Sequence, residues 1–186
     1  TEDDVTRSDS IAVTVNEAVT EKRAFLIGIA DYEYGDIDLS APPYDVDRMH
    51  DVLNHCGTGF ALITELKDLQ ATKINILSEI TTTFSQADEN DVSYFYFSGH
   101  GTFFESTAYL CPSDFNFFTN TAISINELEN ALNTIPGTKV VILDSCHSGG
   151  FIGKGRASTD PTNYLEDFNQ NIIKSFRTNN LEKSLV

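Results

Sequence analysis

Four short apolar runs, separated by segments with helical spacing, constrain the fold of this 186-residue chain more than any other feature of the sequence. The runs are AFLIGIA (24–30), ALITEL (61–66), VSYFYF (92–97) and KVVILD (139–144). Apolar runs of this length are typical of strands that are buried on both faces of a sheet. Because helical segments connect them, we predict an α/β fold with a mostly parallel central sheet and helices on both faces.

Three segments between these runs predict the helices. In the first, from about residue 44 to residue 57, apolar side chains recur every three or four positions. The second, residues 71–84, has the same spacing, and its predicted inward-facing residues are Ile74, Leu77, Ile80 and Phe84. Ser124 and Glu127 have the spacing of a capping box, so a third helix is expected to begin there.

The two ends of the chain differ in composition from its middle. Residues 1–22 are expected to be an N-terminal arm or leader, in which IAVTV could add a short strand. Residues 23–150 form the core domain, with an aromatic-rich loop that runs through Phe118 and contains a short strand in TAYLCP. Residues 151–186 predict an exposed linker followed by an amphipathic helix at about 164–176.

The excess of acidic residues limits the partners that this chain can bind. Its formal net charge is −16 and its pI is near 4.4. Such a charge argues against nucleic acid and anionic membrane surfaces, and it suits basic ligands or divalent cations. No apolar run approaches the length of a membrane span. The three cysteines lack metal-ligand spacing, so we expect a reducing compartment, the cytoplasm.

Two of the predicted strands end in residues that carry chemistry. VSYFYFSGHG delivers His100 between two glycines, and VVILDSCHSGG delivers Cys146. Ligands of parallel α/β sheets bind outside the carboxyl ends of the strands. A histidine can take the proton of a thiol during nucleophilic attack, and the amides of Gly101 and Cys146 could bind the oxyanion that forms. Either residue alone would more often be structural, so the hypothesis depends on both.

The two-residue period of a strand adds binding residues to this pair. Ser98 should lie on the same side as His100, and Asp144 on the same side as Cys146. A carboxylate beside a thiolate raises the pKa of the thiol and so hinders attack. Asp144 therefore needs another purpose, and binding a cationic substrate side chain is the one we favour. The alternative is that Asp144 only accepts backbone hydrogen bonds at the entrance of a loop.

With these motifs, the sequence resembles the caspase-like cysteine peptidases, and in particular their metacaspase branch. The resemblance is carried by SGHG, by DSCHSGG, by RAFLIGIADY with LSAPPYDVDRMHDVL, and by LQATKINILSEI, over about residues 22–152. It implies a caspase-like three-layer sandwich whose large-subunit core is residues 23–150. It also implies that Cys146 is the nucleophile and His100 the general acid and base.

The resemblance further implies an acidic pocket for the residue before the cut bond, the P1 residue. Asp45, Ser98 and Asp144 match its three positions, which implies cleavage after Arg or Lys. For Asp45, the alternative is an ordinary helix N-cap. Two other functions stay open: a non-catalytic scaffold with this fold, and a protease that is part of a larger signalling or defence protein.

The sequence departs from the family pattern after the nucleophile. The family sheet has six strands, and the residues after Cys146 do not predict two more, so we expect a small-subunit segment or a second chain to complete the sheet. Self-cleavage is expected at basic residues, with candidates Lys154, Arg156, Lys174, Arg177 and Lys183. The chemistry requires no cofactor. Calcium is expected as an activator, but its ligands cannot be located in the sequence.

Overall fold

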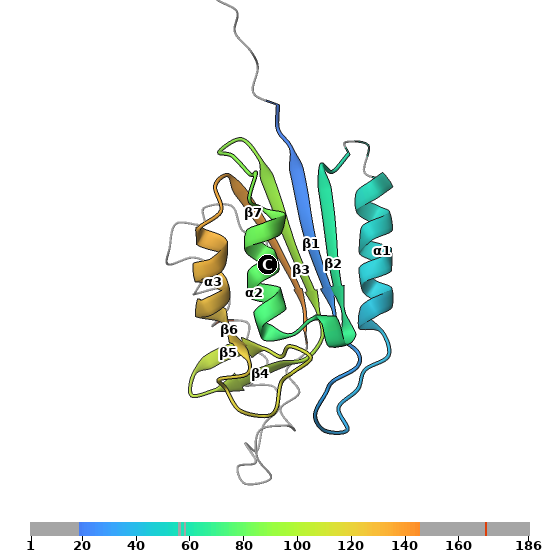
Figure 1. Cartoon of the computed structure of the whole chain (residues 1–186), viewed down its shortest axis with the longest axis vertical. Helices are drawn as coiled ribbons and strands as arrows, with labels where there is room; N and C mark the ends of the chain where they lie inside the picture. Colours follow the sequence, from blue (N-terminus) through green and yellow to red (C-terminus); the bar gives the residue numbers. More distant parts are fainter. Residues whose placement is uncertain (1–18, 56, 58, 146–169, 171–186) are drawn as a thin grey trace, which may run out of the picture.

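A four-stranded parallel sheet forms the centre of the protein (Figure 1). The computed structural model describes residues 19–55, 57, 59–145 and 170. The strands are β1 (Lys22–Gly28), β2 (Leu62–Lys67), β3 (Val92–Ser98) and β7 (Thr138–Asp144). They pair in the order β2-β1-β3-β7, and every neighbouring pair is parallel. Each predicted apolar run is therefore a strand, and the predicted α/β fold is confirmed.

Helices cover both faces of this sheet and complete three layers. They are α1 (Pro42–His55), α2 (Lys73–Thr83) and α3 (Ile125–Asn133). On one face, Ala24 and Leu26 of β1 pack with Val46 and Leu53 of α1. The other face is covered by α2 and α3, and α3 begins with the predicted capping box of Ser124.

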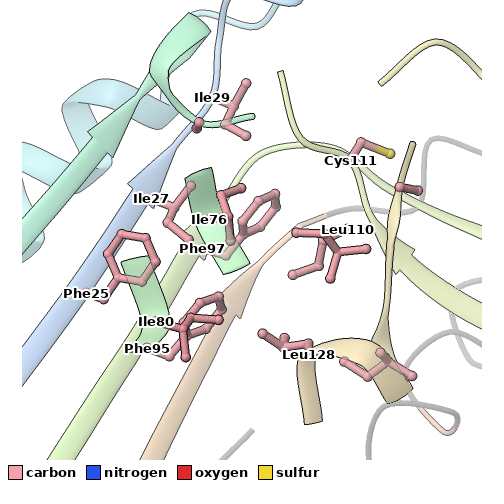
Figure 2. Close-up of a cluster of buried hydrophobic side chains, with 14 of the residues drawn as sticks. Phe25, Ile27, Ile29, Ile76, Ile80, Phe95, Phe97, Leu110, Cys111 and Leu128 are labelled. Carbon is pink, nitrogen blue, oxygen red and sulfur yellow. The ribbon is translucent and has the colours of Figure 1, made fainter. Parts of the chain in front are cut away.

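Alternate residues of each strand enter the two cores, as the strand period requires. Figure 2 shows the larger core, where side chains of the sheet meet those of α2, α3 and β5; the labelled residues include Phe25, Ile27, Phe95, Phe97, Ile76, Ile80, Leu110 and Leu128. Burying an aromatic or branched side chain of this size stabilises a fold by about 1.5–3 kcal/mol. This core therefore holds α2 and α3 to the sheet.

The predicted inward face of α2 is partly wrong. Ile74 is 77% exposed, whereas Ile76 and Ile80 are fully buried. Phe84 is buried as predicted, and Leu77 is partly buried. Ile76 and Ile80 are one helical turn apart, so the helix presents a face that is rotated from the predicted one.

A small antiparallel sheet replaces part of the predicted aromatic loop. Its strands are β4 (Gly101–Phe104), β5 (Thr107–Leu110) and β6 (Ile123–Ser124), in the order β4-β5-β6. Only β5 was expected, within TAYLCP. The sheet lies below the carboxyl ends of the parallel strands in Figure 1 and begins one residue after His100.

The turn between β4 and β5 predicts a stabilising substitution. Glu105 and Ser106 have φ angles of 46° and 64°, a region that costs an L-residue about 1–2 kcal/mol. We expect Glu105→Gly to raise the free energy of unfolding by about 0.5–1 kcal/mol, measured by urea denaturation. Glu89→Gly is the control, because Glu89 is an exposed turn residue without a positive φ. A loss of stability in both variants would contradict the prediction.

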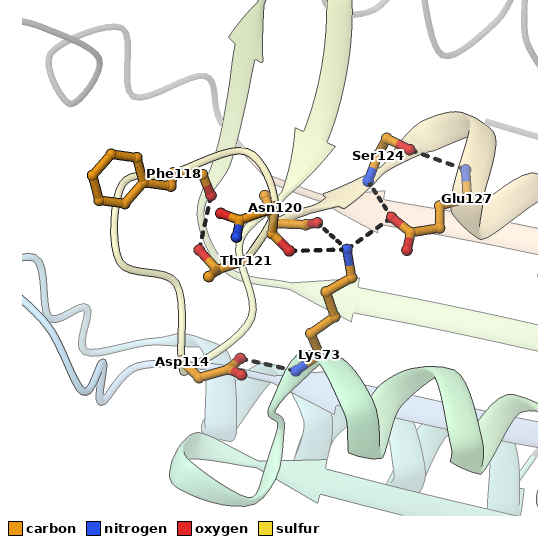
Figure 3. A network of polar contacts seen from close by, with 8 residues as sticks. Lys73, Asp114, Phe118, Asn120, Thr121, Ser124 and Glu127 are labelled. Carbon is orange, nitrogen blue, oxygen red and sulfur yellow. Dashed lines mark hydrogen bonds and ion pairs between the residues drawn. The ribbon is translucent and has the colours of Figure 1, made fainter.

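Lys73, the first residue of α2, connects three parts of the chain (Figure 3). Its ammonium group donates to the carbonyl oxygen of Ala122 at 2.8 Å and pairs with the Glu127 carboxylate at 2.9 Å. Its backbone N–H donates to the carboxylate of Asp114 at 2.9 Å. Glu127 also belongs to the capping box of α3. The loop after β5 is thus held to the beginnings of both helices.

Asp91, which precedes β3, organises the amino-terminal ends of the strands. Its carboxylate accepts hydrogen bonds from the Glu21 N–H at 2.8 Å and the Asp88 N–H at 3.1 Å, and pairs with the Arg23 guanidinium at 2.6 Å. The side chains of Arg23 and Asp91 are only 7% and 4% exposed. Burial alone would raise the pKa of Asp91, but the two N–H groups and Arg23 outweigh it, so the pKa lies below its ordinary value.

Several sequence predictions lie outside the described residues. These are the short strand in IAVTV, Cys146, the linker and the C-terminal helix, and any segment that would complete the sheet. In the described part of the chain, β7 is an edge of the parallel sheet. No helix in that part is both long and apolar enough to cross a membrane.

Candidate active site

The carboxyl ends of β3 and β7 place two of the predicted site residues side by side. Ser98 is the last residue of β3 and pairs in register with Asp144, the last residue of β7. The next residue, Gly99, donates its N–H to the carbonyl oxygen of Asp144 at 3.2 Å. Partners in a parallel register present their side chains on the same face of the sheet. Ser98 and Asp144 therefore face the same side of the sheet.

Helix α1 brings Asp45 to the same place. The Ser98 hydroxyl donates to the Asp45 carboxylate at 3.4 Å, a long hydrogen bond. The alternative of an N-cap role for Asp45 is wrong, because α1 begins at Pro42 and Asp45 lies within its first turn. Proline is well accommodated in a first turn, where its missing N–H costs nothing. The three predicted pocket residues thus converge at the carboxyl end of the sheet.

Tyr96 is a member of this cluster that the sequence analysis missed. It lies two residues before Ser98 on the same face of β3 and is 5% exposed. Burial raises the pKa of the Tyr96 phenol, and the negative charges of Asp144 and Asp45 raise it further, while a hydrogen bond with Ser98 opposes the shift. A neutral phenol therefore lies next to the two carboxylates. The strand period that located Ser98 could also have identified Tyr96.

His100 follows β3 and is held by a loop that comes after β1. Its ring Nε2 lies 2.7 Å from the carbonyl oxygen of Ile37, so Nε2 carries the proton and donates it. With the proton on Nε2, Nδ1 is the ring nitrogen that can accept a second proton. The backbone N–H of His100 donates to the hydroxyl of Tyr32 at 2.8 Å. His100 is 5% exposed, so these two hydrogen bonds are shielded from solvent.

The remaining predicted residues are placed less completely. Gly101 is buried and opens β4, where it pairs with Leu110, and its role in binding an oxyanion stays a prediction. Cys146 lies outside the described residues and follows Asp144 by two positions in the sequence. Cys111 is 2% exposed, and burial raises the pKa of its thiol. A buried, protonated thiol is a poor nucleophile, so Cys111 is not a candidate.

Carboxylates do not form a recognisable metal site in the part of the chain that the structure describes. Among those residues, no group of three or more His, Cys, Asp or Glu side chains could hold a metal ion. Asp45 accepts a hydrogen bond from the Ser98 hydroxyl, and the charges of Asp45 and Asp144 both act on the Tyr96 phenol.

Fold and site together define a class: a three-layer α/β protein with a buried histidine and an acidic cluster at the carboxyl end of its parallel sheet. The sequence matches the family described as Caspase domain over residues 21–183. It is 30% identical to metacaspase-7 of Arabidopsis thaliana over 173 residues, which cover 83% of this chain and 41% of that protein. It is 31% identical to metacaspase-4 of the same plant over 153 residues, with 73% and 35% covered.

Among solved structures, the crystal structure of protein GSU0716 from Geobacter sulfurreducens is similar in fold. The TM-score is 0.59 at 20% sequence identity, over 86% of this chain and 62% of that one. The chain belongs to the caspase-domain family and resembles its metacaspases. It spans about two fifths or less of the length of these plant metacaspases.

Proposed function

We propose that this chain carries the catalytic core of a cysteine endopeptidase that cuts peptide bonds after Arg or Lys. Cys146 is the nucleophile and His100 the general acid and base. The observation that supports the proposal most strongly is the convergence of Asp45, Ser98 and Asp144 at the sheet end that also holds His100. Membership of the caspase-domain family supports the peptidase class.

The tautomer of His100 suggests how the proton moves. Nδ1 takes the thiol proton of Cys146 while the sulfur adds to the carbonyl carbon of the scissile bond. The imidazolium then returns the proton to the departing amine as the C–N bond breaks, which leaves a thioester. Water, deprotonated by His100, hydrolyses the thioester and restores the thiol. The Ile37 carbonyl stabilises the imidazolium through the Nε2–H.

The acidic cluster accounts for the preference at P1. A guanidinium or ammonium group that enters between Asp45 and Asp144 donates charge-assisted hydrogen bonds to two carboxylates. The Ser98 hydroxyl is a further polar contact. The buried phenol of Tyr96 stays neutral and adds no charge to the cluster. An acidic P1 side chain would be repelled by the same groups. Basic residues after Cys146 are candidate self-cleavage sites for the same reason.

Partners and calcium belong to the proposal as well. Peptides or proteins with a basic P1 residue are the substrates. A small-subunit segment, in the same or a second chain, pairs with β7, because β7 presents an open edge within the described part of the sheet. Calcium activates the enzyme, a role that the excess of carboxylates favours.

Hydrolysis of fluorogenic peptides with Arg, Lys or Asp at P1, with and without calcium, tests the proposal. We expect cleavage after Arg and Lys, and we expect Cys146→Ala to reduce it to about a thousandth or less. Cys111→Ala is the control, because it removes a buried thiol but keeps the backbone N–H that donates to the His100 carbonyl oxygen at 2.9 Å. Cleavage after Asp would overturn the pocket assignment. Equal rates in Cys146→Ala would overturn the nucleophile.

A further inference from the structure

We propose that Tyr32 is a positioning residue for His100, and that its hydroxyl and the Ile37 carbonyl together fix the histidine in one orientation. The inference rests on the proposed function, because it concerns the residue that we assign as general acid and base. The inference adds Tyr32 to the site as a residue that neither forms nor breaks a bond in the reaction.

The contacts to His100 come from two directions. The Tyr32 hydroxyl accepts the backbone N–H of His100 at 2.8 Å, and the Ile37 carbonyl accepts its Nε2–H at 2.7 Å. One contact fixes the main chain and the other fixes the ring. The rings of Tyr32 and His100 also lie close, with centroids 5.1 Å apart and planes inclined by 41°. Both side chains are 5% exposed, so little solvent competes for these bonds.

The loop that carries both contacts is itself held in place. The Tyr32 N–H donates to the Asp38 carboxylate at 3.0 Å, across the turn that contains Ile37. The N–H groups of Ala30 and Asp31 donate to the Asp68 carboxylate at 2.8 and 3.1 Å. Asp38 therefore ties Tyr32 to the segment of Ile37, and Asp68 ties the whole loop to the end of β2. Groups held in this way are preorganised before substrate arrives.

Gly99 shows that the chain makes room for this hydroxyl. A Cβ atom on Gly99 would lie 3.0 Å from the Tyr32 hydroxyl oxygen and 3.2 Å from the Phe97 ring. Gly99 therefore faces Tyr32 and Phe97. The glycine before His100 is thus explained by the approach of Tyr32.

Removing the hydroxyl should affect turnover more than binding. In Tyr32→Phe the ring still fills its place, but the buried N–H of His100 loses its acceptor, which favours a shift of the backbone. A small misplacement of a proton-transfer group lowers the rate of the chemical step. Tyr32 contacts His100, whereas Asp45, Ser98 and Asp144 bind the substrate side chain in the proposed function. We therefore expect kcat to fall about five- to tenfold, with KM within about twofold.

Imidazole NMR and kinetics on the full chain test the inference together. Long-range ¹H–¹⁵N spectra report the tautomer of each histidine, and His100→Gln assigns the signal of His100. The control is Tyr34→Phe, the same chemical change two residues along the loop, where the side chain is 45% exposed. We expect His100 to be a single Nε2–H tautomer in the unaltered chain and in Tyr34→Phe, and a mixture in Tyr32→Phe.

The outcomes separate this inference from the proposed function. If Tyr32→Phe and Tyr34→Phe agree in both tautomer and kcat, or if only KM changes, the positioning role is overturned. If no form of the chain cleaves any peptide, the proposed function fails, yet the NMR comparison still decides whether Tyr32 orients His100. Should Tyr32→Phe not fold, Asp38→Asn keeps the phenol but weakens its attachment. An unchanged tautomer and kcat in Asp38→Asn would then overturn the inference.

Discussion

Replacing Asp91 with alanine is expected to lower the free energy of unfolding by about 3 kcal/mol. The substitution leaves the buried Arg23 guanidinium without its 2.6 Å partner and removes the acceptor of two backbone N–H groups. Uncompensated buried charge is among the costliest defects in a fold. The expected loss of stability is at the lower end of the range for broken buried ion pairs, because Arg23 keeps a second partner, Glu21.

Urea denaturation at neutral pH measures this loss, with Glu21→Ala as the control. Glu21 pairs with the same guanidinium, but its side chain is 49% exposed. Exposed ion pairs contribute about 0–1 kcal/mol, so the control should be nearly as stable as the unaltered protein. Equal losses in the two variants would show that Asp91 is not the residue that compensates Arg23.

The effect of Asp91 should also depend on pH. Its pKa in the folded protein lies below the ordinary value of 3.8, so the unfolded chain takes up the proton first as the pH falls. The stability that Asp91 contributes is complete above this ordinary value and is lost as the pH falls through the lower, folded pKa. The difference between the unaltered protein and Asp91→Ala should therefore be constant from neutral pH to about pH 5 and shrink below pH 4.

The double variant Asp45→Asn, Asp144→Asn is expected to lower kcat/KM for an Arg substrate about a hundredfold. Each asparagine keeps the shape of the side chain but removes a charge that would face the substrate cation in the proposed pocket. Truncating such a partner costs about 2–5 kcal/mol when the pair is buried. Asp144 is exposed, so solvent screens its attraction to the substrate cation. We therefore expect each substitution to lower kcat/KM by about tenfold.

Asp47→Asn is the matched control for this experiment. Asp47 lies on the same helix as Asp45, but it is exposed and its carboxylate binds the Lys67 ammonium at 2.6 Å. The control changes the net charge without touching the acidic cluster, so kcat/KM should change less than about twofold. An equal loss in Asp47→Asn would mean that long-range charge attracts the substrate. An unchanged kcat/KM in the double variant would show that neither carboxylate binds the P1 side chain.

The central sheet was predictable because each of its strands is a single apolar run with a distinct end. The same ends made the meeting of Ser98 and Asp144 predictable, since parallel strands in register bring their last residues together. The face of α2 was not predictable, because apolar residues occupy more than one face of the segment and both Ile74 and Ile76 fit a helical spacing. Contact with the sheet selects Ile76.

Two other features depended on information that local sequence lacks. The β4–β5 hairpin turns at Glu105 and Ser106, which are not the Gly or Asn residues that mark such turns. Tyr32 and Ile37 reach His100 from a loop whose path is set by Asp38 and by the distant Asp68. Hydrogen bonds between a side chain and a loop backbone that is distant in the sequence leave no periodic pattern. These contacts could therefore be found only in the structure.

Gly28, where β1 ends, has a consequence for how specificity can change in relatives of this protein. A Cβ atom there would lie 2.5 Å from the Pro42 carbonyl oxygen and 2.7 Å from a methyl carbon of Val46. Any larger residue would push away the start of α1, and with it Asp45, from Ser98, which pairs with Gly28 in the sheet. A residue without a side chain therefore sets the spacing of the acidic cluster. Mutational searches for altered P1 preference should include this glycine, because the position of a whole helix can change there in one step.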